Sequence, residues 1–157
     1  MQSARIGLSK DYITSCTDNR LFGSFVEHMG ATVYNGIYEP DHQTADPNGF
    51  RQDVLELVRD LCLSAIRYPG GNFVSGFNWE DSVGPEKERP TRLELAWRAI
   101  EPNEFGLNEF MKWLSQTEAE PILAVNLGTG DVENAYHLVE YCNFQKGSFY
   151  SDMRKRH

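Results

Sequence analysis

Three short apolar segments, each followed by a helical pattern, constrain the possible fold of this sequence more than any other feature. The apolar segments lie at residues 21–26, 64–66 and 121–125, and the helical patterns lie at residues 50–62, 106–118 and 131–142. Strands that are apolar on both faces and alternate with helices are typical of a parallel sheet covered by helices. We therefore expect an α/β fold. After Asn143 the sequence turns polar, and no further element is expected there.

Two architectures fit this alternation, a doubly wound sheet and a (β/α)8 barrel. A barrel needs eight units and about 250 residues, whereas this chain has 157 residues and three units. In both architectures, ligands bind at the carboxyl ends of the strands. The three strands are followed by polar residues, namely Glu27, Arg67 and Asn126. Because a buried charge without a role is costly, these residues predict a binding site at that edge.

Composition and charge argue against several classes of function. The chain has 15 Lys+Arg and 23 Asp+Glu, which gives a net charge of −8. This charge disfavours nucleic acid or an anionic membrane as a partner, because both attract basic proteins. No apolar run is long enough to cross a bilayer, and the first residues lack the apolar stretch of a secretory signal. The three cysteines and four histidines lack metal-ligand spacing, which indicates reduced thiols, a cytoplasmic setting and no metal.

A long polar segment, residues 68–103, lies on the ligand side of the second expected strand. It combines Trp79 and Trp97 with several Asn, Asp and Glu residues. Sugar sites use this combination, because aromatic rings pack on the apolar faces of a sugar while polar groups bind its hydroxyls. The alternative, that the two tryptophans only pack the loop against the rest of the fold, fits the composition equally well.

Two glycine-bearing turns follow the second and third strands, at residues 68–72 and 127–131. A phosphate can bind at such a turn when a helix begins there. Neither turn has the Gly-x-Gly-x-x-Gly spacing or the Gly-Lys-Ser/Thr of a P-loop. Tight turns that need a positive φ are the favoured explanation for these glycines.

The acidic residues do not by themselves form a glycosidase site. Ordinary glycoside hydrolysis needs two carboxylates, one to protonate the leaving oxygen and one to attack or to activate water. Glu27 is a single carboxylate, and an ion pair with Arg67 at the neighbouring strand end is an alternative role for it. Asp53, Glu94 and Glu109 are expected to be solvated surface charges.

Blocks of consecutive residues resemble the opening of the glycoside hydrolase family 51 α-L-arabinofuranosidases. They include Gly-Ser-Phe-Val-Glu-His at 23–28 and Ile-Arg-Tyr-Pro-Gly-Gly-Asn-Phe-Val-Ser-Gly at 66–76. Further blocks lie at residues 36–40, 49–54, 78–81, 95–98, 105–110, 124–129 and 138–143. The resemblance runs from about Tyr12 to His157. One departure is Thr129-Gly130-Asp131, where the family usually has Thr-Arg-Gly.

The resemblance implies a (β/α)8 barrel joined to a β-sandwich. Residues 1–15 would supply an N-terminal strand of the sandwich, and residues 16–157 the first three βα units of the barrel, ending before strand 4. It also implies retaining hydrolysis of terminal, non-reducing α-L-arabinofuranosyl residues of arabinan or arabinoxylan oligosaccharides. Family members similar to this chain are mostly intracellular hexamers that need no cofactor.

The resemblance also assigns site residues. Glu27, Arg67, Asn72 and Trp97 match residues that bind the substrate sugar, whereas the acid/base and nucleophile glutamates of the family lie beyond His157. The chain alone is therefore expected to be inactive. The alternative is a catalytically silent fragment that at most binds sugar or assembles with a complementary half. A third hypothesis, a sugar-phosphate enzyme, is weakened because neither of the turns that hold Gly70 and Gly128 contains a Lys or Arg.

Overall fold

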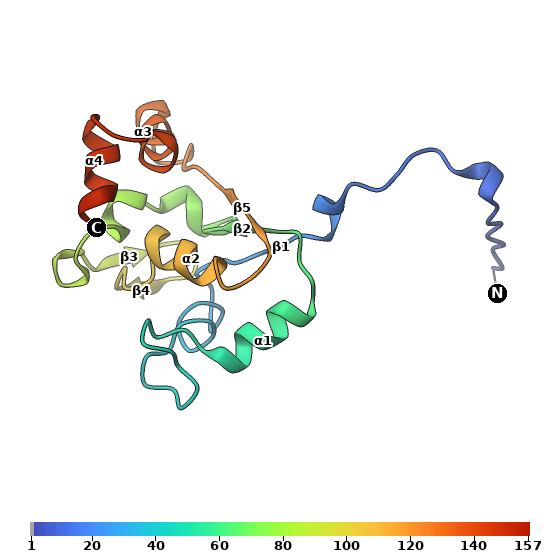
Figure 1. Cartoon of the computed structure of the whole chain (residues 1–157), viewed down its shortest axis with the longest axis horizontal. Coiled ribbons are helices and arrows are strands. Elements are labelled where there is room, and N and C mark those ends of the chain that lie inside the picture. The colour runs from blue at the N-terminus through green and yellow to red at the C-terminus, as the bar shows by residue number, and fades with distance from the viewer. Residues whose placement is uncertain (1) are drawn as a thin grey trace.

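The computed structural model describes residues 2–157, in which three parallel strands alternate with helices. The strands are β1 (Ser24–Phe25), β2 (Ala65–Tyr68) and β5 (Glu120–Leu123), in the spatial order β1-β2-β5. The helices are α1 (Gln52–Asp60), α2 (Leu107–Leu114), α3 (Val132–Asn143) and α4 (Phe149–Arg156) (Figure 1). In the sheet, Phe25 is in register with Arg67, and Arg67 with Ile122. The expected α/β fold with parallel strands is therefore confirmed.

The first strand is shorter than the sequence predicts. Only Ser24–Phe25 pair with β2, whereas Asn19–Phe22 form a 3-10 helix. The side chain of Asp18 starts that helix by accepting a hydrogen bond from the backbone N–H of Arg20 at 2.9 Å. Leu21 and Phe22, which the apolar pattern placed in a buried strand, are exposed. An apolar run is thus not sufficient evidence for a strand when a polar cap directly precedes it.

The N-terminal residues contain no strand in the described part of the chain. Residues 2–18 are exposed and irregular apart from a 3-10 turn at Lys10–Tyr12, and they extend away from the body of the protein (Figure 1). Neither Ile6 nor Leu8 has a strand partner among residues 2–157. The assignment of residues 1–15 to a sandwich strand stays a prediction, and Met1 lies outside the described residues.

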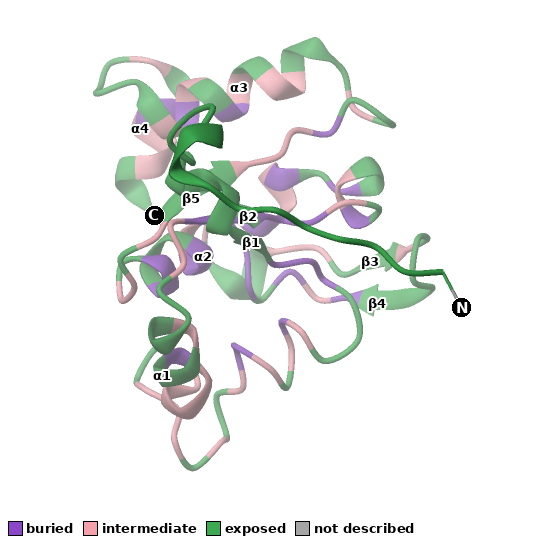
Figure 2. Ribbon diagram, turned by 90° about the vertical axis from the view of Figure 1, so that its right-hand side faces the viewer, coloured by how far each residue is buried: buried purple, intermediate pink, exposed green. Residues whose placement is uncertain are grey.

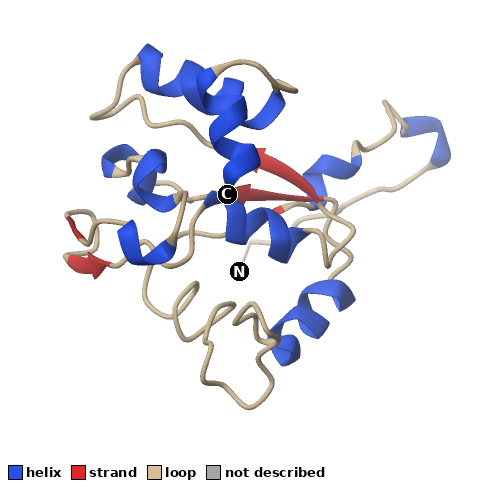
Figure 3. Cartoon of the chain, turned by 60° about the vertical axis from the view of Figure 1, so that its left-hand side comes forward, coloured by secondary structure: helices blue, strands red, loops and turns tan. Residues whose placement is uncertain are grey.

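The loop at residues 68–103 is more ordered than its composition suggests. It contains three 3-10 helices, Phe73–Gly76, Trp79–Ser82 and Glu86–Glu88. It ends in an antiparallel hairpin of β3 (Arg92–Glu94) and β4 (Ala99–Glu101). Figure 3 shows this hairpin standing apart from the three-stranded sheet.

Helix α4 was not expected from the polar sequence after Asn143. Its only buried residues are Tyr150 and Ser151, so its sequence has no apolar stripe from which a helix could be predicted. Ser148 and Ser151 cap its first turn, and the guanidinium of Arg154 donates to the carbonyl oxygens of Tyr141 and Phe144. Capping and backbone contacts to the neighbouring helix thus replace the missing apolar face.

Two apolar clusters form the core. The first lies under α1 and α2 and includes Phe50, Leu55, Tyr68, Phe105, Phe110 and Trp113. The second lies under α3 and α4 and includes Phe73, Trp79, Leu138, Tyr141 and Tyr150. Buried residues concentrate between the helices and the loop at the carboxyl edge of the sheet (Figure 2). None of the helices within residues 2–157 is long and apolar enough to cross a membrane.

Candidate functional site

Glu27 lies two residues after β1, at the carboxyl edge of the sheet. The bond from Val26 N–H to the Arg67 carbonyl, at 2.8 Å, continues the pairing with β2 up to this point. The Glu27 side chain is buried, and its Oε1 accepts a hydrogen bond from the backbone N–H of Phe73 at 2.9 Å. Its Oε2 accepts no hydrogen bond from any residue of 2–157. One carboxylate oxygen is thus fixed by the backbone, and the other is available to a ligand.

The turn after β2 packs directly against this carboxylate. Gly70 has φ +126°, and a Cβ at this position would lie 2.8 Å from the Glu27 Cα. A side chain at residue 70 would therefore be strained and would also collide with Glu27. At Gly71, a Cβ would lie 3.7 Å from the Arg67 Nη2 and 3.8 Å from the Glu27 Oε2. The two glycines let the turn pass close to both charged groups. The prediction of a positive φ is confirmed for Gly70 and is wrong for Gly71, Gly128 and Gly130. At Gly128 and Gly130 the close approach of a backbone oxygen, and not φ, disfavours a side chain.

Arg67 lies beside Glu27 without forming an ion pair with it. Within residues 2–157 no ion pair joins the two side chains. The guanidinium lies instead over the ring of Phe25, with 5.1 Å between the Arg67 Cζ and the ring centroid. Because Arg67 is exposed, its donors are accessible to a ligand. The alternative in which Glu27 and Arg67 neutralise each other is not observed.

Asn72 and Trp97 lie on different parts of the long loop. Asn72 directly precedes Phe73, and its exposed side chain makes no capping hydrogen bond to the 3-10 helix that follows. Trp97 lies in the turn of the β3–β4 hairpin and is 38% exposed. Its backbone N–H donates to the Glu94 carboxylate at 2.6 Å. The structure thus brings Glu27, Arg67 and Asn72 to one edge and places Trp97 on a separate arm.

The other candidates from the sequence have structural roles. Trp79 is buried, and its Nε1 donates to the carbonyl oxygen of Asn134 at 3.1 Å, so this tryptophan packs the loop. Asn126 donates to the carbonyl oxygen of Phe77 at 3.0 Å and accepts from the N–H groups of Gly128 and Thr129. Its amide is therefore fully used by the turn at 127–131.

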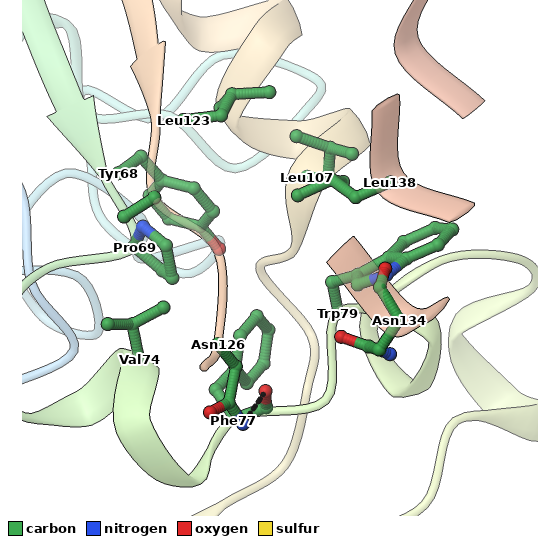
Figure 4. Close-up of a pocket in the computed structure, with 11 residues that line it drawn as sticks. Tyr68, Pro69, Val74, Phe77, Trp79, Leu107, Leu123, Asn126, Asn134 and Leu138 are labelled. Atoms are coloured by element: carbon green, nitrogen blue, oxygen red, sulfur yellow. Dashed lines mark hydrogen bonds between the residues drawn. The ribbon is translucent and has the colours of Figure 1, made fainter. Parts of the chain in front are cut away.

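Figure 4 shows the cavity between the carboxyl ends of β2 and β5, with Trp79 and Asn126 among its lining residues. Its volume of about 20 Å³ is enough for one water molecule and far too small for a sugar. This cavity therefore cannot hold a sugar, and the Glu27 Oε2 and the Arg67 guanidinium do not line it.

A buried polar network that sequence reasoning missed lies directly behind Glu27. His28 Nδ1 lies 2.9 Å from Glu101 Oε2, and His28 Nε2 lies 3.0 Å from the Tyr68 hydroxyl. The other oxygen of Glu101 accepts from the Tyr34 hydroxyl and from the N–H of Asn103. The only signal in the sequence was a histidine next to a strand-end glutamate. Its acid partner is 73 positions away, a separation that no local pattern reveals.

The pKa values in this network follow from burial and hydrogen bonding. Burial alone would raise the pKa of Glu101, but the bonds from His28, Tyr34 and the Asn103 N–H outweigh it and lower the pKa. Burial also raises the pKa of Tyr68 well above its ordinary value, and the nearby Glu101 charge raises it further. Glu101 is thus held as a carboxylate while its tyrosine neighbour stays neutral.

A second buried pair corrects the prediction that Glu109 is a solvated surface charge. Arg89 donates to both carboxylate oxygens of Glu109, at 2.9 and 3.1 Å, and the two side chains are only 3% and 10% exposed. Arg89 also donates to the carbonyl oxygens of Gly84 and Asn103. Glu109 accepts from the Gly106 N–H at 2.9 Å at the start of α2. This pair fastens the long loop to the helix that follows it.

The predictions that Glu94 and Asp53 are solvated surface charges have different outcomes. The Glu94 carboxylate caps the hairpin turn, whereas the partly exposed Asp53 pairs with Arg51 at 2.7 Å. The hydrogen bond from Arg51, followed by one from Thr44, holds the pKa of Asp53 well below its ordinary range. At the departure from the family pattern, Asp131 accepts from the Asn134 N–H at 2.8 Å and caps α3. Among residues 2–157, no three His, Cys, Asp or Glu side chains are placed to hold a metal ion.

Comparison with known proteins adds to this geometry. The α-L-arabinofuranosidase 1 domain family matches residues 57–157. The chain is 54% identical over all 157 residues to the intracellular exo-α-(1→5)-L-arabinofuranosidase 1 of Bacillus subtilis. It is equally similar to the intracellular exo-α-(1→5)-L-arabinofuranosidase of Acetivibrio thermocellus. The match spans the whole chain but only 31% of the length of either relative.

Solved structures agree. The family 51 α-L-arabinofuranosidase AbfB of Bifidobacterium longum superposes with a TM-score of 0.86 at 53% identity, over 88% of this chain and 27% of that one. The arabinose complex of the Thermotoga maritima α-L-arabinofuranosidase superposes with a TM-score of 0.84 at 44% identity, over 85% of this chain and 28% of that one. With its sheet edge, its loop and its sequence all in agreement, the chain belongs to the glycoside hydrolase family 51 α-L-arabinofuranosidases.

Proposed function

We propose that this chain forms the sugar-binding edge of a retaining α-L-arabinofuranosidase. The enzyme would release terminal, non-reducing α-L-arabinofuranosyl residues from arabinan or arabinoxylan oligosaccharides. One observation carries the proposal: the free Oε2 of Glu27 and the unpaired guanidinium of Arg67 flank the same glycine turn. The names of the relatives, which are exo-acting arabinofuranosidases, support it.

The chemistry of the edge suits a neutral sugar. A carboxylate oxygen accepts hydrogen bonds from hydroxyls, a guanidinium donates to hydroxyl oxygens, and the amide of Asn72 does both. The face of Trp97 offers apolar area to the ring of the sugar. The four residues match the substrate-binding residues of the family one by one, and three of them lie along one sheet edge. An uncharged ligand also agrees with the net charge of −8.

We further infer that the three βα units are the first part of a (β/α)8 barrel, and that residues 1–15 join a β-sandwich. In this arrangement the acid/base and nucleophile glutamates follow strands 4 and 7, in sequence equivalent to the part of the relatives that this chain does not span. Cytoplasmic location, a hexameric assembly and independence of any cofactor are part of the same proposal. The alternative is a silent fragment that binds sugar or assembles with a complementary half.

The test uses two forms of the protein. The 157-residue chain alone should hydrolyse no aryl α-L-arabinofuranoside, because ordinary glycoside hydrolysis needs a pair of carboxylates. A fusion of residues 1–157 to the remaining sequence of the Bacillus subtilis relative should hydrolyse it. Turnover by the short chain, or an inactive but folded fusion, would contradict the proposal.

Substitutions in the fusion then test the site. Glu27→Ala and Arg67→Ala should each lower kcat/KM by roughly 10²-fold or more, because each removes a charged hydrogen-bonding partner of the sugar. Asp53→Ala, on the face of α1, is the control and should change kcat/KM by no more than about threefold. Equal effects at Glu27 and Asp53 would contradict the assignment of the sugar-binding edge.

A further inference from the structure

We propose that His28 is a positioning residue that holds the Trp97 hairpin in place relative to Glu27. The inference rests on the proposed function, in which Glu27 and Trp97 both contact the sugar. It adds a residue that touches no sugar and acts through Glu101.

The first link joins His28 to Glu27. The two residues are adjacent in the chain and are both buried. The His28 ring stacks on Phe73, with 4.4 Å between ring centroids and 10° between planes. Phe73 is the residue whose N–H holds the Oε1 of Glu27. A movement of the His28 ring would therefore displace Phe73 and, through the Phe73 N–H, the Oε1 of Glu27.

The second link joins His28 to the hairpin. The side chains of His28 and Glu101 are 2% and 7% exposed, and 2.9 Å separates Nδ1 from Oε2. An ionised carboxylate only accepts hydrogen bonds, so Nδ1 carries the proton of this bond. The far nitrogen, Nε2, lies 3.0 Å from the Tyr68 hydroxyl at the end of β2. The ring is thus held on both sides and has one orientation.

The third link joins Glu101 to Trp97 through the β3–β4 hairpin. Glu101 is the last residue of β4 and pairs with Arg92 at the base of the hairpin. Arg92 is fastened to Asp81 by an exposed ion pair, at 2.8 Å. At the other end, the Glu94 carboxylate binds the backbone of the turn and holds the N–H of Trp97. The hairpin is therefore a short stiff arm whose buried anchor is the His28–Glu101 bond.

The His28–Glu101 contact is buried and the Arg92 side chain is exposed, and this difference indicates which contact holds the hairpin. An ion pair with an exposed partner, such as Arg92–Asp81, is screened by solvent and contributes little, whereas removing the His28 imidazole takes a hydrogen-bond donor from a buried carboxylate. Without the imidazole, Glu101 keeps the Tyr34 hydroxyl and the Asn103 N–H but loses the partner that is adjacent to Glu27 in the chain. The arm would then move relative to the sheet edge and carry Trp97 with it.

A test without sugar uses the 157-residue chain labelled with 5-fluorotryptophan and followed by fluorine NMR. The three tryptophan signals are assigned by single Trp→Phe variants. His28→Phe keeps a ring to stack on Phe73 but cannot bond Glu101, and it should shift or broaden the Trp97 signal. His28→Asn loses the stacking but places an amide N–H near the position of Nδ1, and it should restore the Trp97 signal.

Two internal controls distinguish the loss of the His28–Glu101 bond from a general disturbance of the fold. Tyr34→Phe removes a different hydrogen bond to Glu101 and should leave the Trp97 signal close to its original position. The signal of Trp113, a buried residue of α2, should not change in any of these variants, and it reports an intact fold. An unchanged Trp97 signal in His28→Phe would overturn the proposal, and so would a His28→Asn variant as disturbed as His28→Phe. A disturbed Trp113 signal in both would assign His28 a general structural role instead.

The catalytic readout comes second. In the fusion with the Bacillus subtilis relative, His28→Phe should raise KM about tenfold and change kcat by no more than about threefold, because a displaced Trp97 weakens ground-state and transition-state binding alike. His28→Asn should recover most of the KM. Since the fluorine experiment contains no sugar, its failure counts against His28 alone, whereas an inactive fusion counts against the proposed function.

Discussion

The loop at the carboxyl edge and the sheet beneath it are stabilised in different ways. The loop has little regular structure, yet it is tied by two buried polar pairs, the His28–Glu101 hydrogen bond and the Arg89–Glu109 ion pair. The sheet is regular, but within residues 2–157 both its outer strands lack a second neighbour. Phe25 and Ile122, in these two strands, are about half exposed.

The difference shows which contacts fix the conformation of each region. Hydrogen bonds and ion pairs have strict distance and angle requirements, so they fix the loop and the sheet edge at Glu27 in one geometry. Apolar contacts on the sheet are less directional and depend on surfaces that face solvent in this structure. The site edge is therefore specified by residues within this chain, whereas the sheet is the region that would gain most from additional contacts.

The largest effect is expected from breaking the buried pair in the loop. Glu109→Ala leaves the Arg89 guanidinium buried without its main partner and should lower the free energy of unfolding by about 3–5 kcal/mol. Urea titration of the chain, followed by circular dichroism, measures this. Replacing both residues, as Arg89→Met with Glu109→Leu, should cost clearly less, because no unpaired charge remains.

The exposed pair between Arg92 and Asp81 provides the matched control. The Arg92 side chain is 60% exposed, so Arg92→Ala should cost at most about 1 kcal/mol. If Glu109→Ala and Arg92→Ala had equal effects, the distinction between a loop held by buried pairs and one held by surface contacts would be lost.

An intermediate effect is expected from acid. The pKa of Glu101 lies below its ordinary value of 4.5 in the folded chain. A carboxylate of this kind stabilises the fold above its unfolded pKa, and that stability is lost as the pH falls through the folded pKa. The chain should therefore lose stability below about pH 4.5, and Glu101→Gln should lose less over the same range. Urea midpoints at several pH values test this, with the exposed Glu88→Gln as a control that keeps the original acid dependence.

The smallest effect on stability is expected on the open sheet. Ile122→Thr should change the free energy of unfolding by less than about 1 kcal/mol, whereas the same change at the buried Ile66 should cost about 2 kcal/mol or more. We also expect the chain to bind a hydrophobic dye or to self-associate, because exposed apolar surface favours both. Ile122→Thr should weaken that dye binding. A monodisperse chain that binds no dye would show that the sheet is complete without further contacts.

The sequence was informative where a local pattern decides the structure. The parallel pairing of β2 with its neighbours follows from alternating apolar strands and helices. Glu27 and Arg67 lie at the carboxyl ends of β1 and β2, as the sequence predicts, whereas their role as ligand-binding residues stays a prediction. The failures have physical reasons. Leu21 and Phe22 were assigned to a strand because they are apolar, but the cap from Asp18 forms a 3-10 helix instead.

Long-range polar contacts could not be predicted at all. The partner of Glu109 is a loop arginine 20 positions earlier, and the bond of His28 to Glu101 spans 73 positions. Single residues of this kind carry no periodicity, so a charged residue on a helix is assigned to the surface by default. Most of what fixes the sheet edge at Glu27 consists of such contacts. The four proposed site residues could therefore be assigned by resemblance, whereas the network that supports them could not.

Gly70 has a consequence for reading genetic variation in proteins like this one. A single extra methyl group at this position would meet the backbone of Glu27, although residue 70 itself contributes no side chain to the site. A variant with alanine there would retain Glu27, Arg67, Asn72 and Trp97 unchanged and would pass any inspection for intact site residues. The Glu27 carboxylate would nevertheless be displaced. A search for the four proposed site residues in a newly sequenced gene should therefore include the glycine that packs behind Glu27.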